Sequence, residues 1–79
     1  MTSKNFLFMK LRAQITIDRE DKIRWLVIES DENDTKGYFM YYHIDDANAF
    51  DTWHNSLGEA FKAAQLQYGI LKEDWVAIQ

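Results

Sequence analysis

A strict alternation of apolar and polar residues constrains this chain most. From Phe6 to Ile17 the odd-numbered positions are all apolar, namely Leu7, Met9, Leu11, Ala13, Ile15 and Ile17. The even-numbered positions in residues 10–16 are polar, and a period of two residues is typical of a strand with one buried face. Residues 22–30 and 38–44 are two further β-type runs beyond polar turns at residues 18–21 and 31–37. The chain is therefore predicted to begin as an antiparallel three-stranded meander.

The apolar positions also predict how the three strands pair, because residues that face each other across an antiparallel ladder share one side of the sheet. The predicted pairs are Ile17–Ile23, Ile15–Trp25, Ala13–Val27, Trp25–Tyr42 and Val27–Met40. This register gives the sheet an inner apolar face. It leaves a second apolar group on the outer face, made of Phe8, Leu26, Ile28, Phe39 and Tyr41.

One helix is predicted near the C-terminus. Ser56 and Glu59 fit a capping box, and Gly69 followed by Ile70 is typical of a Schellman helix end. An apolar stripe at helical spacing lies between them, formed by Leu57, Ala60, Phe61, Ala64 and Tyr68. We expect this stripe to meet Trp25, Met40 and Ile15 on the inner face. Residues 45–55 lack a clean period and are predicted as a compact loop, and the tail after Gly69 as a short edge strand.

These elements predict a single α+β domain over residues 1–79. Its two layers would be a three- to four-stranded antiparallel sheet and one amphipathic helix. The chain has 79 residues, and if it were divided into two domains, each would be too small to bury a core. Five phenylalanines, four tyrosines and three tryptophans supply large side chains for packing.

Composition indicates the cellular location and limits the classes of partner. The chain has no cysteine, and small secreted domains usually depend on disulfides, so a cytoplasmic location is expected. No export signal or apolar run of membrane-spanning length is visible, which argues against a membrane protein. The net charge is −4 and the nine lysines and arginines are dispersed, which argues against nucleic acid as a partner.

The residues give little support to catalysis, so a non-enzymatic protein without a cofactor is expected. Ser56 is better explained as a helix cap than as a nucleophile, and the three glycines are isolated, which excludes a phosphate-binding loop. A small-molecule or metal site beside His43, Asp51 and His54 is the alternative, although their spacing matches no known ligand pattern and no metal is predicted.

The outer apolar group is the most informative feature for function. One helix cannot cover both faces of a sheet, and contiguous apolar patches rich in aromatic residues mark interaction surfaces. Phe8, Leu26, Ile28, Phe39 and Tyr41 therefore predict a protein-binding surface, for a protein partner or for a second copy in a homodimer. The competing interpretation is that residues 45–55 or the C-terminal tail fold across this face.

The C-terminal third has a recurring pattern. It reads Trp53, then Ser56-Leu57, then Glu59-Ala60, and closes with Tyr68-Gly69-Ile70 and Glu73-Asp74-Trp75. This pattern resembles the ends of many short bacterial proteins of unknown function. The resemblance implies a bacterial source and a shared fold, and it carries no activity to particular residues.

Overall fold

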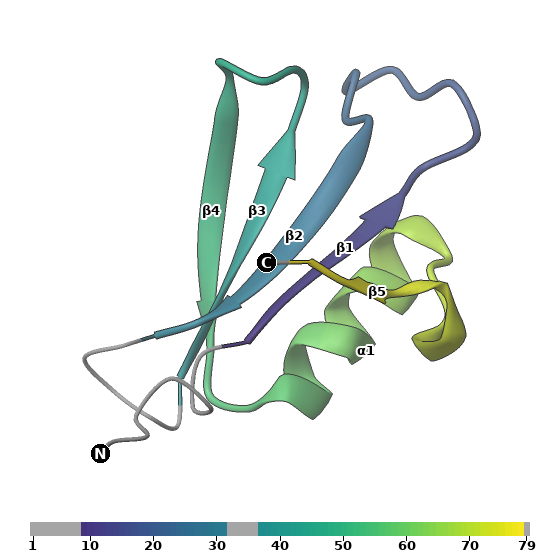
Figure 1. Cartoon of the computed structure of the whole chain (residues 1–79). Helices are drawn as coiled ribbons and strands as arrows, with labels where there is room; N and C mark the ends of the chain where they lie inside the picture. Colours follow the sequence, from purple (N-terminus) through teal and green to yellow (C-terminus); the bar gives the residue numbers. More distant parts are fainter. Residues whose placement is uncertain (1–8, 32–36, 79) are drawn as a thin grey trace.

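The computed structural model of the chain describes residues 9–31 and 37–78. Its strands are β1 (Lys10–Gln14), β2 (Trp25–Ser30), β3 (Tyr38–His43), β4 (Ala49–His54) and β5 (Val76–Ala77), with helix α1 (Leu57–Tyr68) and a 3₁₀ turn over Lys72–Asp74. The strands form one sheet in the order β4-β3-β2-β1-β5, and every neighbouring pair is antiparallel. Helix α1 lies across one side of this sheet (Figure 1). The predicted α+β class is confirmed, but the described residues hold five strands, not three or four.

Strand β4 occupies most of the segment that the sequence predicted as a loop. A tight turn after β3 starts it: the Ile44 N–H donates to the Asn48 carbonyl at 2.9 Å, and the Asp45 carboxylate accepts the N–H groups of Ala47 and Asn48, both at 2.8 Å. An aspartate that accepts backbone N–H groups just ahead of it mimics a turn. The prediction was wrong because β4 is exposed on both faces and so shows no apolar alternation.

The Asp45 turn makes the stability of the fold depend on pH. Its hydrogen bonds to Asn48 and Ala47 lower the pKa of the Asp45 carboxyl. A lowered folded-state pKa gives stability that is present above the unfolded value, near 4, and is lost as the pH falls through the folded value. We expect Asp45→Asn to lose less stability than the wild type between neutral pH and about pH 3, measured as urea midpoints.

A matched control for that experiment is Asp46→Asn, which removes the neighbouring carboxylate and leaves these hydrogen bonds in place. Equal pH slopes for the wild type and Asp45→Asn would contradict the assigned role of Asp45.

A bulge at the start of β2 changes the side of the sheet on which its residues lie. His43 is the register partner of Trp25, yet its carbonyl also accepts the Arg24 N–H at 2.8 Å. Arg24 and Trp25 of β2 thus both oppose His43 of β3, and this two-to-one pairing is a β-bulge. The alternation shifts there, so that Ile23 is buried among the core residues while Trp25 lies on the opposite face with its partner His43.

The bulge explains why the predicted pairing of β2 was wrong. The observed pairs are Ala13–Leu26, Leu11–Ile28, Leu26–Tyr42 and Ile28–Met40, a shift of one residue from the prediction. A one-residue shift turns every side chain of a strand to the other face. Leu26 and Ile28 therefore join the inner face, while Trp25 and Val27 lie on the outer face. The faces predicted for Ala13, Ile15, Met40 and Tyr42 are confirmed.

The core lies between the inner face and α1. Leu26, Ile28 and Met40 are completely buried, and Ala60 and Ala64 of the helix are completely buried as well. Leu57, Phe61 and Tyr68 pack around them, so the predicted helical stripe is confirmed. Its predicted contact with Trp25 is wrong, because that side chain belongs to the outer face. Small alanines at the centre of the stripe let the helix approach the sheet closely.

Helix α1 begins after Ser56 and ends at Gly69, as the sequence predicted. The Ser56 hydroxyl accepts the Glu59 N–H at 3.1 Å, and Gly69 takes a left-handed conformation with φ of 71°. The Gly69 N–H bonds the Gln65 carbonyl at 2.9 Å, which is the single bond of an αL helix end, and the Ile70 N–H bonds the Ala64 carbonyl at 3.5 Å, one residue before the carbonyl that the predicted Schellman motif would use. No helix in residues 9–31 and 37–78 is long and apolar enough to cross a membrane.

The tail returns the chain to the far edge of the sheet. After the 3₁₀ turn, β5 pairs with β1 through Leu11–Ala77 and Arg12–Val76, and the Ile78 N–H bonds the Lys10 carbonyl at 2.9 Å. The predicted C-terminal edge strand is thus confirmed. It runs beside β1 in Figure 1.

Candidate protein-binding surface

The structure separates the five residues that the sequence assigned to the outer surface. Phe39 and Tyr41 do lie on the outer face and are partly exposed. Leu26 and Ile28 were predicted there wrongly, because the β2 bulge turns them into the core, where both have 0% exposure. Phe8 falls outside the described residues. The outer face must therefore be defined again from the residues observed on it.

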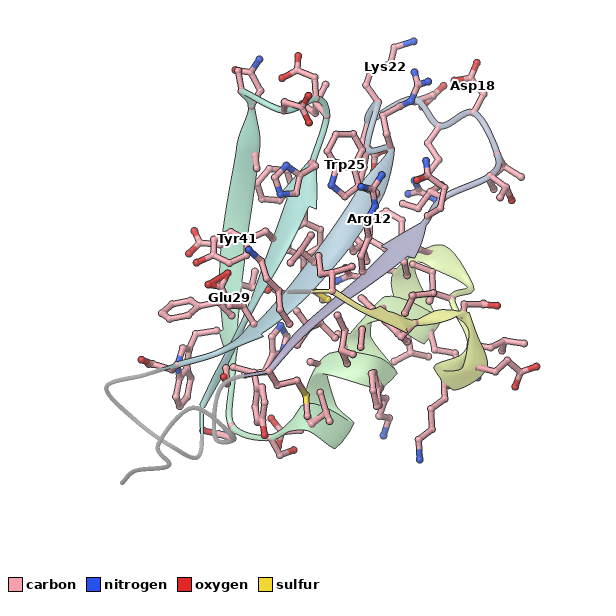
Figure 2. The ribbon with its side chains drawn as sticks, viewed as in Figure 1. Arg12, Asp18, Lys22, Trp25, Glu29 and Tyr41 are labelled. Carbon is pink, nitrogen blue, oxygen red and sulfur yellow. The ribbon has the colours of Figure 1, made fainter. Side chains whose placement is uncertain are left out.

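A row of three side chains crosses the outer face near one end of the strands. The Arg12 guanidinium from β1 lies over the Trp25 ring, 4.8 Å from its centroid. The His43 ring from β3 stacks on Trp25 with centroids 4.9 Å apart and planes only 7° from parallel. Figure 2 shows Arg12 beside Trp25 on this face. Because its neighbours stand on the strands to either side, the indole is held between them and its orientation is fixed.

A second row continues the aromatic surface along β3. Tyr41 tilts against His43 with centroids 6.5 Å apart, and Phe39 tilts against Tyr41 at 6.1 Å. Val27 is buried between its cross-strand partners Arg12 and Tyr41 and lines a shallow groove of about 380 Å³. We call the six residues Arg12, Trp25, Val27, Phe39, Tyr41 and His43 the outer aromatic surface.

Opposite charges border the outer aromatic surface. Lys10 and Arg12 lie on the β1 side, whereas Glu29 and Asp46 also line the groove and Asp51 faces Tyr41 from β4. Burial raises the pKa of the Tyr41 phenol, and the carboxylates of Glu29, Asp51 and Asp31 raise it further. The phenol therefore stays neutral at physiological pH and can both donate and accept a hydrogen bond.

The alternative site beside His43, Asp51 and His54 does not assemble in this structure. His43 and Asp51 lie on the outer face, but His54 pairs with Tyr38 at the other end of β4 and points to the inner side, where its Nε2 lies 2.8 Å from the Thr52 hydroxyl. In the part of the chain that the structure describes, no three histidine, cysteine or acidic side chains gather as a metal site would require.

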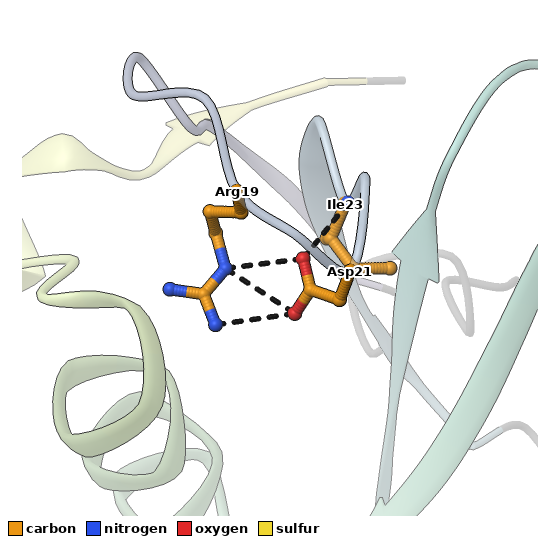
Figure 3. Close-up of polar contacts among 3 residues, drawn as sticks. All are labelled: Arg19, Asp21 and Ile23. Atoms are coloured by element: carbon orange, nitrogen blue, oxygen red, sulfur yellow. Dashed lines mark hydrogen bonds and ion pairs between the residues drawn. The ribbon is translucent and has the colours of Figure 1, made fainter.

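The Arg19 to Asp21 pair is the clearest ionic contact elsewhere, and it has a structural role. The Arg19 guanidinium donates to both carboxylate oxygens of Asp21 at 3.1–3.2 Å, and Asp21 also accepts the Ile23 N–H at 3.1 Å (Figure 3). These bonds lower the pKa of the Asp21 carboxyl. Arg19 also lies over the Tyr68 ring at 4.4 Å. The group joins the β1–β2 loop to the end of α1.

Sequence reasoning assigned Trp25 and Val27 to the inner face and so missed them as members of the outer aromatic surface. Residues 25–28 are all apolar, so periodicity could not say which pair faces inward. Glu29 offered a usable signal, because the predicted register turned this charged side chain toward the core. Comparison with known proteins adds no assignment: no protein family, no curated protein and no solved structure matches this chain.

Proposed function

We propose that this chain is a non-enzymatic protein-interaction module and that the outer aromatic surface is its binding site. The single observation that supports this most is that α1 lies on the inner side, while the outer side carries Trp25, Phe39, Tyr41 and His43 only partly buried. Aromatic residues and arginine are the side chains enriched at the centres of protein interfaces.

The geometry of the surface favours a protein over a small ligand. The groove is shallow and spreads over three strands, and ligand sites are typically concave pockets that enclose most of the ligand. Trp25 is already fixed between Arg12 and His43, so little side-chain entropy is lost when a partner covers it. The basic side chains on β1 and the Asp51 carboxylate on β4 would orient that partner.

The test is a single substitution on this surface. Tyr41→Glu places a charge at the centre of the aromatic rows, and Leu66→Glu is the matched control because Leu66 is 76% exposed on the helix. Chemical crosslinking in source cells first identifies the partner. The purified partner should then bind the wild type and Leu66→Glu. Loss of an interface tyrosine weakens binding by about tenfold or more.

The expected result is therefore one partner that is retained by the control and lost by Tyr41→Glu, with circular dichroism unchanged in both variants. A partner that binds all three proteins equally would place the binding site elsewhere and overturn the assignment of the outer aromatic surface.

A further inference from the structure

Strand β4 forms one long edge of the sheet in the part of the chain that the structure describes. It has six residues and pairs only with β3 among the described strands, without a break in register from Ala49 to His54. Phe50 and Trp53 on this strand are 54% and 43% exposed. They lie on opposite faces, so both sides of the open edge carry a large aromatic ring.

The backbone groups of this edge point outward in a known pattern. The bond from Ile44 N–H to the Asn48 carbonyl marks that pair as hydrogen-bonded. Because such pairs alternate along an antiparallel ladder, the even-numbered residues of β4 bond to β3. The odd-numbered residues, Ala49, Asp51 and Trp53, therefore direct their N–H and C=O groups away from the sheet.

Most of the usual devices that protect an edge strand are absent from residues 49–54. Natural sheets block open edges with lysine, proline, bulges or very short strands. Residues 49–54 contain no lysine, arginine or proline, their ladder with β3 has no bulge, and their one charge is Asp51. The opposite edge differs, because β5 has only two residues. The β4 edge is therefore long enough to pair with another strand, whereas the β5 edge is too short to do so.

We propose that two copies of this chain pair through β4, antiparallel and with Thr52 on the two-fold axis. This register sets Asp51 opposite Trp53 of the second copy and Phe50 opposite His54 of the second copy, each on its own face. A register centred on Asp51 would place two carboxylates opposite each other, which is destabilising. The short β5 edges then end the assembly at two copies, as closed two-fold symmetry requires.

A proline substitution tests the edge selectively. Asp51→Pro removes an outward N–H that makes no bond to β3, and proline is tolerated at such edge positions. Light scattering on a sizing column should give the mass of two chains for the wild type and for Asp51→Ala, and the mass of one chain for Asp51→Pro. A wild type that is monomeric across the concentration range, or an Asp51→Pro variant that stays dimeric, overturns the proposal.

A cysteine pair tests the register and keeps the proposal falsifiable if Asp51→Pro fails to fold. The chain has no cysteine, so Thr52→Cys introduces one thiol per copy. On the axis, a non-hydrogen-bonded pair brings the two Cα atoms to about 4.5 Å, within the range of a disulfide. Mild oxidation should crosslink Thr52→Cys nearly completely and Asp51→Cys poorly, because two residues at position 51 would be about 8 Å apart.

A reversed crosslinking preference would overturn this register. The inference is independent of the proposed function, since Thr52 lies on the inner side and the outer aromatic surface takes no part in the pairing. Adding Tyr41→Glu to Thr52→Cys should leave the crosslink intact, which separates a failure at the edge from a failure of the outer surface.

Discussion

Leu26→Ala is expected to lower the free energy of unfolding by about 2–5 kcal/mol, the usual cost of removing a buried leucine side chain. Leu26 is completely buried between Ala13 on β1 and Tyr42 on β3, in the same core cluster as Ala60 and Ala64 of α1. A chain of this size draws only about 3–5 kcal/mol from its core, so much of the variant should be unfolded at room temperature. Urea denaturation followed by circular dichroism measures the change.

Leu66→Ala is the control because it removes the same atoms from a side chain that is 76% exposed on α1. Its stability should stay within about 0.5 kcal/mol of the wild type. The comparison also tests the bulge in β2, since the register predicted from alternation alone turns Leu26 outward. Equal, small effects at Leu26 and Leu66 would contradict the observed register.

Gly37→Ala is the second substitution with a large expected effect, a loss of about 1–3 kcal/mol in the free energy of unfolding from overpacking. The Trp53 indole lies against the backbone of Gly37, and its Nε1–H donates to the Asp31 carboxylate at 3.2 Å. A Cβ on residue 37 would overlap Cζ2 of Trp53. The indole must therefore move away from the sheet, and we expect the near-ultraviolet tryptophan signal to change together with the urea midpoint.

Gly58→Ala is the matched control, because a Cβ there meets nothing closer than the Ser56 hydroxyl at 3.9 Å. This position lies in α1, where alanine is favoured over glycine by about 0.5–1 kcal/mol. We expect the control to be as stable as the wild type or slightly more stable. An unchanged midpoint and indole signal in Gly37→Ala would show that Trp53 does not pack on this glycine.

The parts of the fold that could be predicted are those with a strong local cause. Ser56 and Gly69 define the helix because their hydrogen bonds are made within a few residues, and β1 has an unbroken period of two. Strand β4 could not be recognised, because an edge exposed on both faces has no need to alternate. Its start is set by the Asp45 turn, whose short-range bonds leave no apolar pattern.

Sequence analysis assigned only part of the candidate site correctly, and the reason is one hydrogen bond between β2 and β3. Phe39 and Tyr41 were assigned to the correct face because Met40 and Tyr42 alternate with them and fit the core. Residues 25–28 carry no such contrast, and the Arg24 N–H bond that shifts their alternation depends on β3, which is distant in the sequence. Tertiary pairing therefore decided which apolar residues became surface and which became core.

The strand order also determines when the sheet can be completed during synthesis on the ribosome. Strands β1 to β4 are joined in sequence, so each can pair with its predecessor as it emerges, in keeping with folding from the N-terminus. Among the described residues, the free edge of β1 is covered by residues 76–78, which are made after the other described strands. A nascent chain that has not yet released β5 therefore exposes two open strand edges in place of one, at the stage when neighbouring chains on the same messenger RNA are closest.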